Sequence, residues 1–154
     1  MRHVLFVCIH NSARSQMAEA FLNEACTGRM RAQSAGLEPG TLNPLVVETM
    51  REVGIDIAGN RTTSVDEMLA SGHGFDHVIT VCDEASAERC PVFPGGGARE
   101  HWGFQDPSAL EGSREDRLRR TREIRDAIRA RVVQWCEQVC PPVAGAPSLS
   151  GDRR

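Results

Sequence analysis

The stretch HVLFVCIHNSARSQMAEAFL, residues 3–22, joins an apolar run to a helical pattern through a short polar loop. Residues 3–7 are rich in β-branched and other large apolar side chains, which is typical of a buried strand. From Ser15 onward, apolar residues recur at helical spacing. The sequence therefore predicts a strand, a loop that begins at Cys8, and a helix.

The same alternation of strand and helix continues along the chain. Apolar runs predict further strands at 30–35, 77–81 and 100–104. Caps, terminators and helical periodicity predict helices at 44–53, 64–70 and 113–140. This alternation favours an α/β fold, a three-layer sandwich with a central four-stranded parallel sheet.

Local signals set the expected ends of these helices. Asn43 is the expected cap of the helix that follows, and Ser64 with Glu67 forms a capping-box pattern. In the long last helix, acidic residues are interspersed among many arginines, so we expect its charged face to be solvated.

Length and charge limit the kind of protein. The 154 residues predict one domain over 1–140, followed by a Pro-, Gly- and Ser-rich tail over 141–154 that we expect to be flexible. A net charge of -3 gives no reason to expect nucleic acid or an anionic membrane as partner. The sequence contains no apolar run of membrane-spanning length and no signal-peptide pattern. We therefore expect a cytoplasmic monomer.

The loop after the first strand has the composition of an oxyanion site. Its backbone N–H groups can surround a tetrahedral anion, with the positive end of the following helix behind them. The residues that would supply this cradle are Ile9, His10, Asn11, Ser12, Ala13 and Arg14. Arg14 adds a planar fork of donors that suits two oxygens. The alternative is a strand-to-helix turn in which cysteine and arginine fall by chance.

Four side chains of this segment have further expected roles. The positive surroundings favour a thiolate at Cys8, which would be the nucleophile. Ser15 can hydrogen-bond the sulfur, and Asn11 can brace the loop. His10 either contacts the anion or shapes the loop, and the sequence favours neither.

Six cysteines need separate interpretations, because in a reducing compartment they are usually unpaired, metal-bound or catalytic. Cys82 directly follows a predicted strand, as Cys8 does, so both can reach the crevice beyond the carboxyl ends of parallel strands. Cys82 and Cys90 are either small buried residues or a redox pair; a zinc site lacks its usual Cys-x2-Cys spacing. For Cys26, Cys136 and Cys140 we expect structural or incidental roles.

Two geometric points concern these cysteines. Cys136 and Cys140 are one helical turn apart and can meet on one face. Eight residues rise about 12 Å along a helix, so a Cys82–Cys90 bond requires that segment to unwind or loop out.

Asp106 precedes Pro107, and proline holds the preceding residue in an extended conformation. A carboxyl fixed above the crevice can protonate a departing oxygen as a general acid. The alternative is an ordinary turn, where Asp-Pro is frequent.

The loop and three further segments resemble the arsenate reductases that share the fold of low molecular weight protein tyrosine phosphatases. The segments are SQMAE at 15–19, SAG at 34–36 and EHWGFQDP at 100–107, and the resemblance covers about residues 1–135. The phosphatases have Gly in place of His10 and Pro in place of Gln16. They also carry tyrosines near Ser108, whereas this chain contains no tyrosine.

The resemblance implies reduction of arsenate to arsenite for detoxification, with electrons from reduced thioredoxin and no bound cofactor. Cys8 would form an adduct with arsenate, Asp106 would be the acid, and Cys82 and Cys90 would carry the disulfide relay. It also implies a potassium site at Asn11, Glu19 and Ser34, but the acidic residue usual near Ser64 is missing. The alternatives are a phosphatase or a non-enzymatic protein that binds arsenite or oxyanions.

Overall fold

The computed structural model describes residues 1–72, 74–82 and 97–139 of the chain. Within them lie the parallel strands β1 (Arg2–Cys8), β2 (Met30–Gly36), β3 (His77–Thr80) and β4 (Ala98–His101). The helices are α1 (Arg14–Ala25), α2 (Pro44–Glu52), α3 (Val65–Ala70) and α4 (Arg114–Val139), with a 3-10 turn at Pro107–Ala109. The strand order is β2-β1-β3-β4, which confirms the predicted four-stranded parallel sheet.

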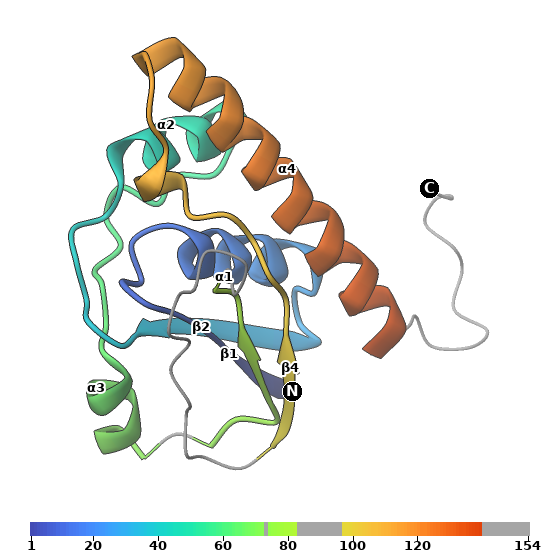
Figure 1. Cartoon of the computed structure of the whole chain (residues 1–154). Coiled ribbons are helices and arrows are strands. Elements are labelled where there is room, and N and C mark those ends of the chain that lie inside the picture. The colour runs from blue at the N-terminus through green and yellow to red at the C-terminus, as the bar shows by residue number, and fades with distance from the viewer. Residues whose placement is uncertain (73, 83–96, 140–154) are drawn as a thin grey trace.

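Alternate residues of β1 serve two separate apolar layers. Val4 and Phe6 face the cluster that α1, α2 and α4 close, whereas Leu5 and Val7 face a smaller cluster under α3. Figure 1 shows α1, α2 and α4 on one side of the sheet and α3 on the other. Because both faces of β1 are buried, its sequence is a continuous apolar run, and the predicted three-layer sandwich is confirmed.

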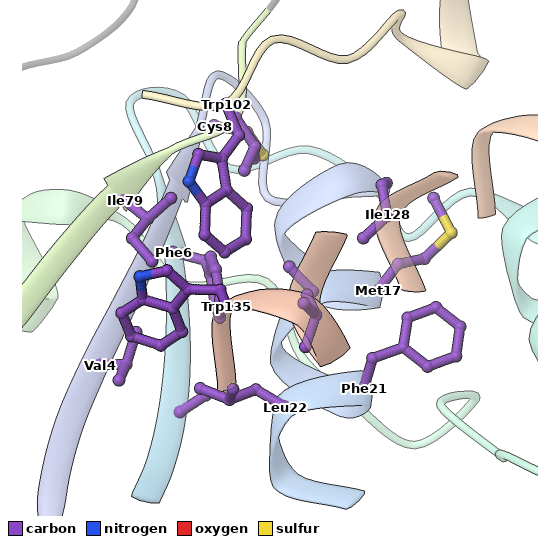
Figure 2. Close-up of a cluster of buried hydrophobic side chains, with 14 of the residues drawn as sticks. Val4, Phe6, Cys8, Met17, Phe21, Leu22, Ile79, Trp102, Ile128 and Trp135 are labelled. Carbon is purple, nitrogen blue, oxygen red and sulfur yellow. The ribbon is translucent and has the colours of Figure 1, made fainter. Parts of the chain in front are cut away.

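Two tryptophans close the larger cluster around β1. The ring of Trp102, just after β4, lies 5.7 Å from that of Phe6 and 5.8 Å from that of Trp135 on α4. Figure 2 shows Trp102 beside Cys8, at the end of the core nearest the loop after β1, with Phe6 and Trp135 farther from Cys8. Packing of α1 and α4 on the sheet therefore fixes the position of this loop.

The expected helix caps are present. The Asn43 side chain accepts a hydrogen bond from the Leu45 N–H, and that of Ser64 accepts one from the Glu67 N–H. The carboxylate of Glu67, however, pairs with Arg61 at 2.6 Å. Only the Ser64 half of the predicted capping box is observed.

The last strand lies earlier than its apolar residues suggested. We predicted 100–104, but β4 spans Ala98–His101 and all its residues are exposed. The apolar signal came from Trp102, which packs into the core after the strand has ended. An exposed edge strand carries no such signal of its own, so the boundary prediction was wrong by about two residues.

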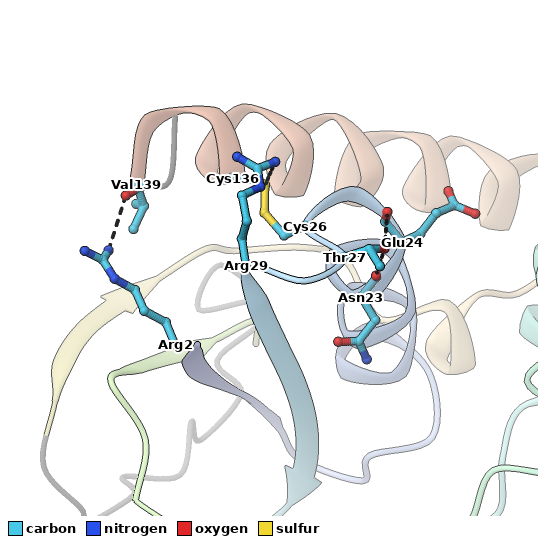
Figure 3. Close-up of a disulfide and its surroundings, with 8 residues drawn as sticks. All are labelled: Arg2, Asn23, Glu24, Cys26, Thr27, Arg29, Cys136 and Val139. Carbon is cyan, nitrogen blue, oxygen red and sulfur yellow. Dashed lines mark hydrogen bonds between the residues drawn. A yellow bond between two sulfur atoms is a disulfide. The ribbon is translucent and has the colours of Figure 1, made fainter. Parts of the chain in front are cut away.

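One disulfide joins elements that are distant in sequence. Cys26, at the end of α1, is bonded to Cys136 of α4, with 6.4 Å between their Cα atoms (Figure 3). A guanidinium nitrogen of Arg29 lies 3.7 Å from the Cys136 sulfur. Cys136 thus has a disulfide partner 110 residues away. Cys140, which we expected could meet Cys136 on one helix face, lies outside the described residues.

The arginines of α4 are not all solvated, contrary to our expectation. Arg125 is buried and donates to the Thr49 carbonyl and to Glu52 on α2. Glu52 also binds Arg122, and the hydrogen bonds from Arg122 and then Arg125 lower the pKa of the Glu52 carboxyl. These contacts tie α4 to α2.

None of the helices in the described part of the chain combines the length and apolar composition of a membrane span. The predicted tail at 141–154 lies outside the described residues.

Candidate active site

Cys8 and Cys82 lie at the same edge of the sheet, beyond neighbouring parallel strands. The β1–β3 register pairs Val7 with Thr80, and the Val81 N–H donates to the Val7 carbonyl at 2.9 Å. Cys82 therefore lies one residue past the position beside Cys8. Both cysteines are buried. The structure thus places two of the three predicted relay residues at the same end of neighbouring strands, whereas Cys90 lies outside the described residues.

Two donors surround the sulfur of Cys8. The Asn11 N–H donates to Cys8 Sγ at 3.1 Å, and Ser15 Oγ lies 2.8 Å from the same sulfur. The predicted hydrogen bond between Ser15 and Cys8 is therefore present, and Asn11, which we expected to brace the loop, also contacts the sulfur through its backbone N–H. Arg14 begins α1 directly beside them.

A backbone group fixes the orientation of the Asn11 amide beside Ser15. The Thr63 N–H can only donate, and it lies 2.8 Å from Asn11 Oδ1. The Asn11 amide nitrogen must then face Ser15 Oγ, at 2.8 Å. Ser15 Oγ thus accepts from Asn11, and its own hydrogen is available to Cys8 Sγ.

Carbonyl groups of the loop after β1 point away from its centre. N–H groups of the facing segment 37–43 donate to the carbonyls of Cys8, Ile9, His10 and Ser12. In a trans peptide the N–H points opposite to the carbonyl, and none of the described peptide bonds is cis. The N–H groups that follow these carbonyls therefore point inward and form a nest that suits an anion.

Gly36 permits this loop to lie against β2. A Cβ at this position would stand 2.6 Å from the Asn11 nitrogen and 2.8 Å from the Ile9 oxygen. Real side chains do not tolerate such distances, so only glycine fits. Asn11 itself has φ 53, a left-handed conformation that asparagine adopts more readily than most residues. The sequence alone indicates no role for Gly36, because the close approach arises only once the loop packs on β2.

The imidazole of His10 bonds to the facing segment. Its Nδ1 lies 3.0 Å from the Glu38 carbonyl oxygen, so this nitrogen is the donor. The ring is exposed, and its contact with Glu38 corresponds to the loop-shaping role rather than to contact with an anion.

Arg14 and Asp106 meet from distant parts of the chain. The buried Arg14 donates from Nη1 to the Phe104 carbonyl at 3.0 Å, and its Nη2 lies 3.7 Å from Asp106 Oδ2. The other oxygen of Asp106 accepts from the Ser108 N–H at 2.9 Å. One carboxyl oxygen is thus held by the turn that Pro107 begins, while the other faces the arginine.

The remaining predicted residues, Glu19 and Ser34, lie together away from the sulfur. Ser34 Oγ donates to Glu19 Oε1 at 2.6 Å, beside a polar cavity of about 360 Å³. Burial raises the pKa of Glu19, and the Ser34 hydrogen bond and the charge of Arg31 offset only part of that.

With Asn11, these two residues are the predicted potassium ligands. The oxygen of Asn11 already accepts from Thr63, and Asn11 does not line the cavity of Glu19. Among the described residues no group of three or more His, Cys, Asp or Glu side chains could hold a metal ion. The potassium site therefore stays a prediction.

Comparisons with known proteins place this chain in a family. The family model for low molecular weight phosphotyrosine protein phosphatases matches residues 3–142. The chain is 40% identical to an arsenate reductase of Shouchella clausii over 134 residues, 87% of this chain and 94% of that protein. It is 37% identical to an arsenate reductase of Bacillus subtilis over the same shares.

Solved structures agree with these relatives. The crystal structure of an arsenate reductase from Archaeoglobus fulgidus has a TM-score of 0.70 and 32% identity, covering 86% of this chain and 97% of its own. A thioredoxin-dependent arsenate reductase of Corynebacterium glutamicum has a TM-score of 0.62 and 28% identity, covering 90% of this chain and 61% of its own.

Proposed function

Since this chain belongs to the low molecular weight phosphotyrosine protein phosphatase family, and within it to the arsenate reductases, we propose that it reduces arsenate to arsenite. In this proposal Cys8 is the nucleophile, Arg14 and the loop N–H groups hold the oxyanion, and Cys82 and Cys90 carry the electrons. Arsenate detoxification is the biological role that such a reaction serves.

The first step joins arsenate to the protein. The Cys8 thiolate forms a sulfur–arsenic bond while the bond from arsenic to one of its hydroxyl groups breaks, and the departing hydroxyl takes a proton from Asp106 and leaves as water. The fork of Arg14 and the inward N–H groups stabilise the negative charge on the other oxygens. Ser15 holds the sulfur in position through its hydroxyl.

The second step reduces the arsenic. The Cys82 thiolate attacks Cys8 Sγ, and the electron pair of the sulfur–arsenic bond stays with arsenic, which passes from As(V) to As(III). Arsenite leaves, and the two sulfurs form a disulfide. Cys90 then attacks Cys82, which forms Cys82–Cys90 and releases Cys8 as thiolate. The two thiols of a thioredoxin-like protein reduce this last disulfide.

The observation that carries the proposal is the position of two buried cysteines at one sheet edge, one residue apart in register. A reductase of this kind needs a second cysteine sulfur that can form a disulfide with the first. The thioredoxin-dependent enzyme of Corynebacterium glutamicum supports a protein dithiol as the reductant. Such a reductant, together with the need to keep the thiols of Cys8, Cys82 and Cys90 reduced, also supports the cytoplasm as the location. A protein dithiol as reductant requires no bound cofactor.

The phosphatase reaction is the second candidate, because the family model and the Cys8, Arg14 and Asp106 geometry are common to both. There, water would hydrolyse a phosphocysteine at Cys8, and Cys82 would have no part. The chain has no tyrosine to flank an aryl phosphate, and Ser108 occupies the region where the phosphatases carry them. This difference favours the reductase.

An assay of NADPH consumption with thioredoxin and thioredoxin reductase tests the proposal. We expect consumption that depends on arsenate and stops in Cys8→Ser and in Cys82→Ser. A chain that hydrolyses p-nitrophenyl phosphate rapidly, and consumes no NADPH with arsenate, is a phosphatase instead.

A further inference from the structure

Gln16 is a buried residue of α1 that the proposed chemistry does not use. Its Nε2 lies 3.2 Å from the carbonyl oxygen of Asn11 and 3.2 Å from that of Arg61. Its Oε1 accepts from the Asn60 side chain at 3.1 Å. Since backbone carbonyls can only accept, the orientation of the Gln16 amide is determined by its surroundings.

The hydrogen bond from Gln16 means that every carbonyl in this part of the loop accepts a hydrogen bond. The loop has five successive carbonyls from Cys8 to Ser12, and N–H groups of segment 37–43 hold four of them outward. The exception is Asn11, whose carbonyl Gln16 holds instead. Gln16 therefore orients the Asn11–Ser12 peptide, and because that peptide is trans, the Ser12 N–H points to the inside of the loop.

The same amide also acts on the surroundings of the nucleophile. Gln16 Nε2 lies 3.3 Å from Asn11 Oδ1, beside the Thr63 N–H that determines the Asn11 orientation. Asn11 in turn donates to Cys8 Sγ and to Ser15 Oγ. Its φ of 53 is a conformation that needs such support, since left-handed backbone is disfavoured for residues other than glycine.

We infer that Gln16 is a positioning residue for the oxyanion loop: its side-chain amide keeps the Ser12 N–H directed at the anion and Asn11 in contact with Cys8. This inference deepens the proposed function and rests on it for the identity of the substrate. The anion cradle itself can be measured without any arsenate reduction.

A pair of glutamine variants tests this role. Gln16→Met keeps the length of the side chain and removes the amide, and Gln33→Met makes the same change on β2, on the wall of the cavity that Gln16 also lines. Inorganic phosphate is the probe, and its dissociation constant is measured by the protection it gives Cys8 against iodoacetamide. Thermal unfolding is followed in parallel.

We expect Gln16→Met to weaken phosphate binding about tenfold, which corresponds to ~1.4 kcal/mol, the scale of one hydrogen bond. Cys8 should also react more slowly with iodoacetamide in the absence of phosphate. Gln33→Met should bind phosphate as the wild type does, even if both variants melt at lower temperature. A Gln16→Met protein that binds phosphate with wild-type affinity would overturn the inference and leave Gln16 as a packing residue.

The test also covers two further outcomes: a variant that does not fold, and a wild type that does not reduce arsenate. If Gln16→Met does not fold, Gln16→Glu replaces it, because it retains the acceptor for Asn60 and removes the donor to the carbonyls. The loss of phosphate affinity is expected there as well. If the wild type binds phosphate but never reduces arsenate, the proposed function fails, while the comparison of Gln16 with Gln33 still decides the role of Gln16.

Discussion

Ser15 Oγ lies 2.8 Å from Cys8 Sγ and accepts from the Asn11 side-chain amide, so its own hydrogen is available to that sulfur. The Asn11 amide is oriented by the backbone N–H of Thr63, which is 52 residues away from Asn11 along the chain. The surroundings of Cys8 at the end of β1 are thus built by groups from α1 and from the segment before α3.

Ser15→Ala should slow the reaction of Cys8 with iodoacetamide at neutral pH by about tenfold or more. A hydrogen bond to a charged acceptor contributes roughly 1.5–3 kcal/mol, and this one stabilises the reactive thiolate. Stopped-flow alkylation measures the effect, with Ser71→Ala as a control that removes a hydroxyl far from the loop. Equal rates in the wild type and Ser15→Ala would show that the serine does not act on the sulfur.

Arg14→Lys should weaken phosphate binding by about 10- to 100-fold, because lysine keeps the charge but loses the planar fork and its charged hydrogen bonds. Isothermal titration with phosphate measures the affinity. Arg129→Lys, on the exposed side of α4, is the matched control and should bind as the wild type does. If Arg14→Lys also binds normally, Arg14 does not clamp the oxyanion.

Glu19 and Glu52 should respond to pH with opposite signs. Burial raises the pKa of Glu19, so the folded protein holds that proton more tightly than the unfolded chain. Its contribution to stability falls as pH rises from the ordinary carboxyl pKa through the folded-state pKa. Glu19→Gln should therefore be more stable than the wild type at pH 7, and the difference should vanish near pH 4.

For Glu52, hydrogen bonds from Arg122 and Arg125 lower the pKa. Its contribution is complete above the ordinary carboxyl pKa and is lost as pH falls through the folded-state value. Glu52→Gln should be less stable than the wild type at pH 7. Urea unfolding between pH 4 and pH 7 compares the two variants, and shifts of the same sign in both at pH 7 would contradict this assignment.

The Cys26–Cys136 disulfide should stabilise the fold without taking part in turnover. It closes a chain separation of 110 residues, and the loss of a bond across so long a loop costs about 5 kcal/mol in the chain-entropy model. Cys136→Ser should lower the unfolding free energy by that order and leave the rate of arsenate reduction unchanged. Wild type incubated with dithiothreitol until this disulfide opens should match the variant. Equal unfolding free energies of the untreated wild type and Cys136→Ser would argue against a structural role for this disulfide.

The sequence predicted those parts of the fold that depend on local pattern. The apolar run before Cys8 marks β1 because both faces of that strand are buried, and the residues around Arg14 indicate an anion loop by their type and order. The boundaries of β4 were missed because its residues are exposed and the apolar signal belongs to Trp102. Pattern alone cannot place a strand whose side chains bury nothing.

Relationships that arise only in three dimensions were not predictable. Cys26 and Cys136 meet because α1 and α4 pack side by side, and no feature of either neighbourhood indicates the other. The role of Gln16 depends on the Asn11 carbonyl, to which no N–H group of segment 37–43 donates. The need for glycine at position 36 depends on how closely the loop approaches β2.

The relay itself is tested most directly by Cys90→Ser. Without Cys90, one turnover should still release arsenite, because Cys8 and Cys82 suffice, and the protein should then stop as a Cys8–Cys82 disulfide. Wild type treated with arsenate in the absence of thioredoxin should accumulate Cys82–Cys90 instead. The Cys26–Cys136 disulfide should be present in both and serves as the internal reference.

Peptide mass mapping after arsenate treatment, with remaining thiols alkylated, identifies these bonds. We expect an arsenate-dependent Cys8–Cys82 disulfide in Cys90→Ser, with one arsenite released for each protein molecule. If Cys8 and Cys82 stay reduced after arsenate, or if Cys90→Ser turns over with thioredoxin at the wild-type rate, the three-cysteine reduction proposed for this chain is contradicted.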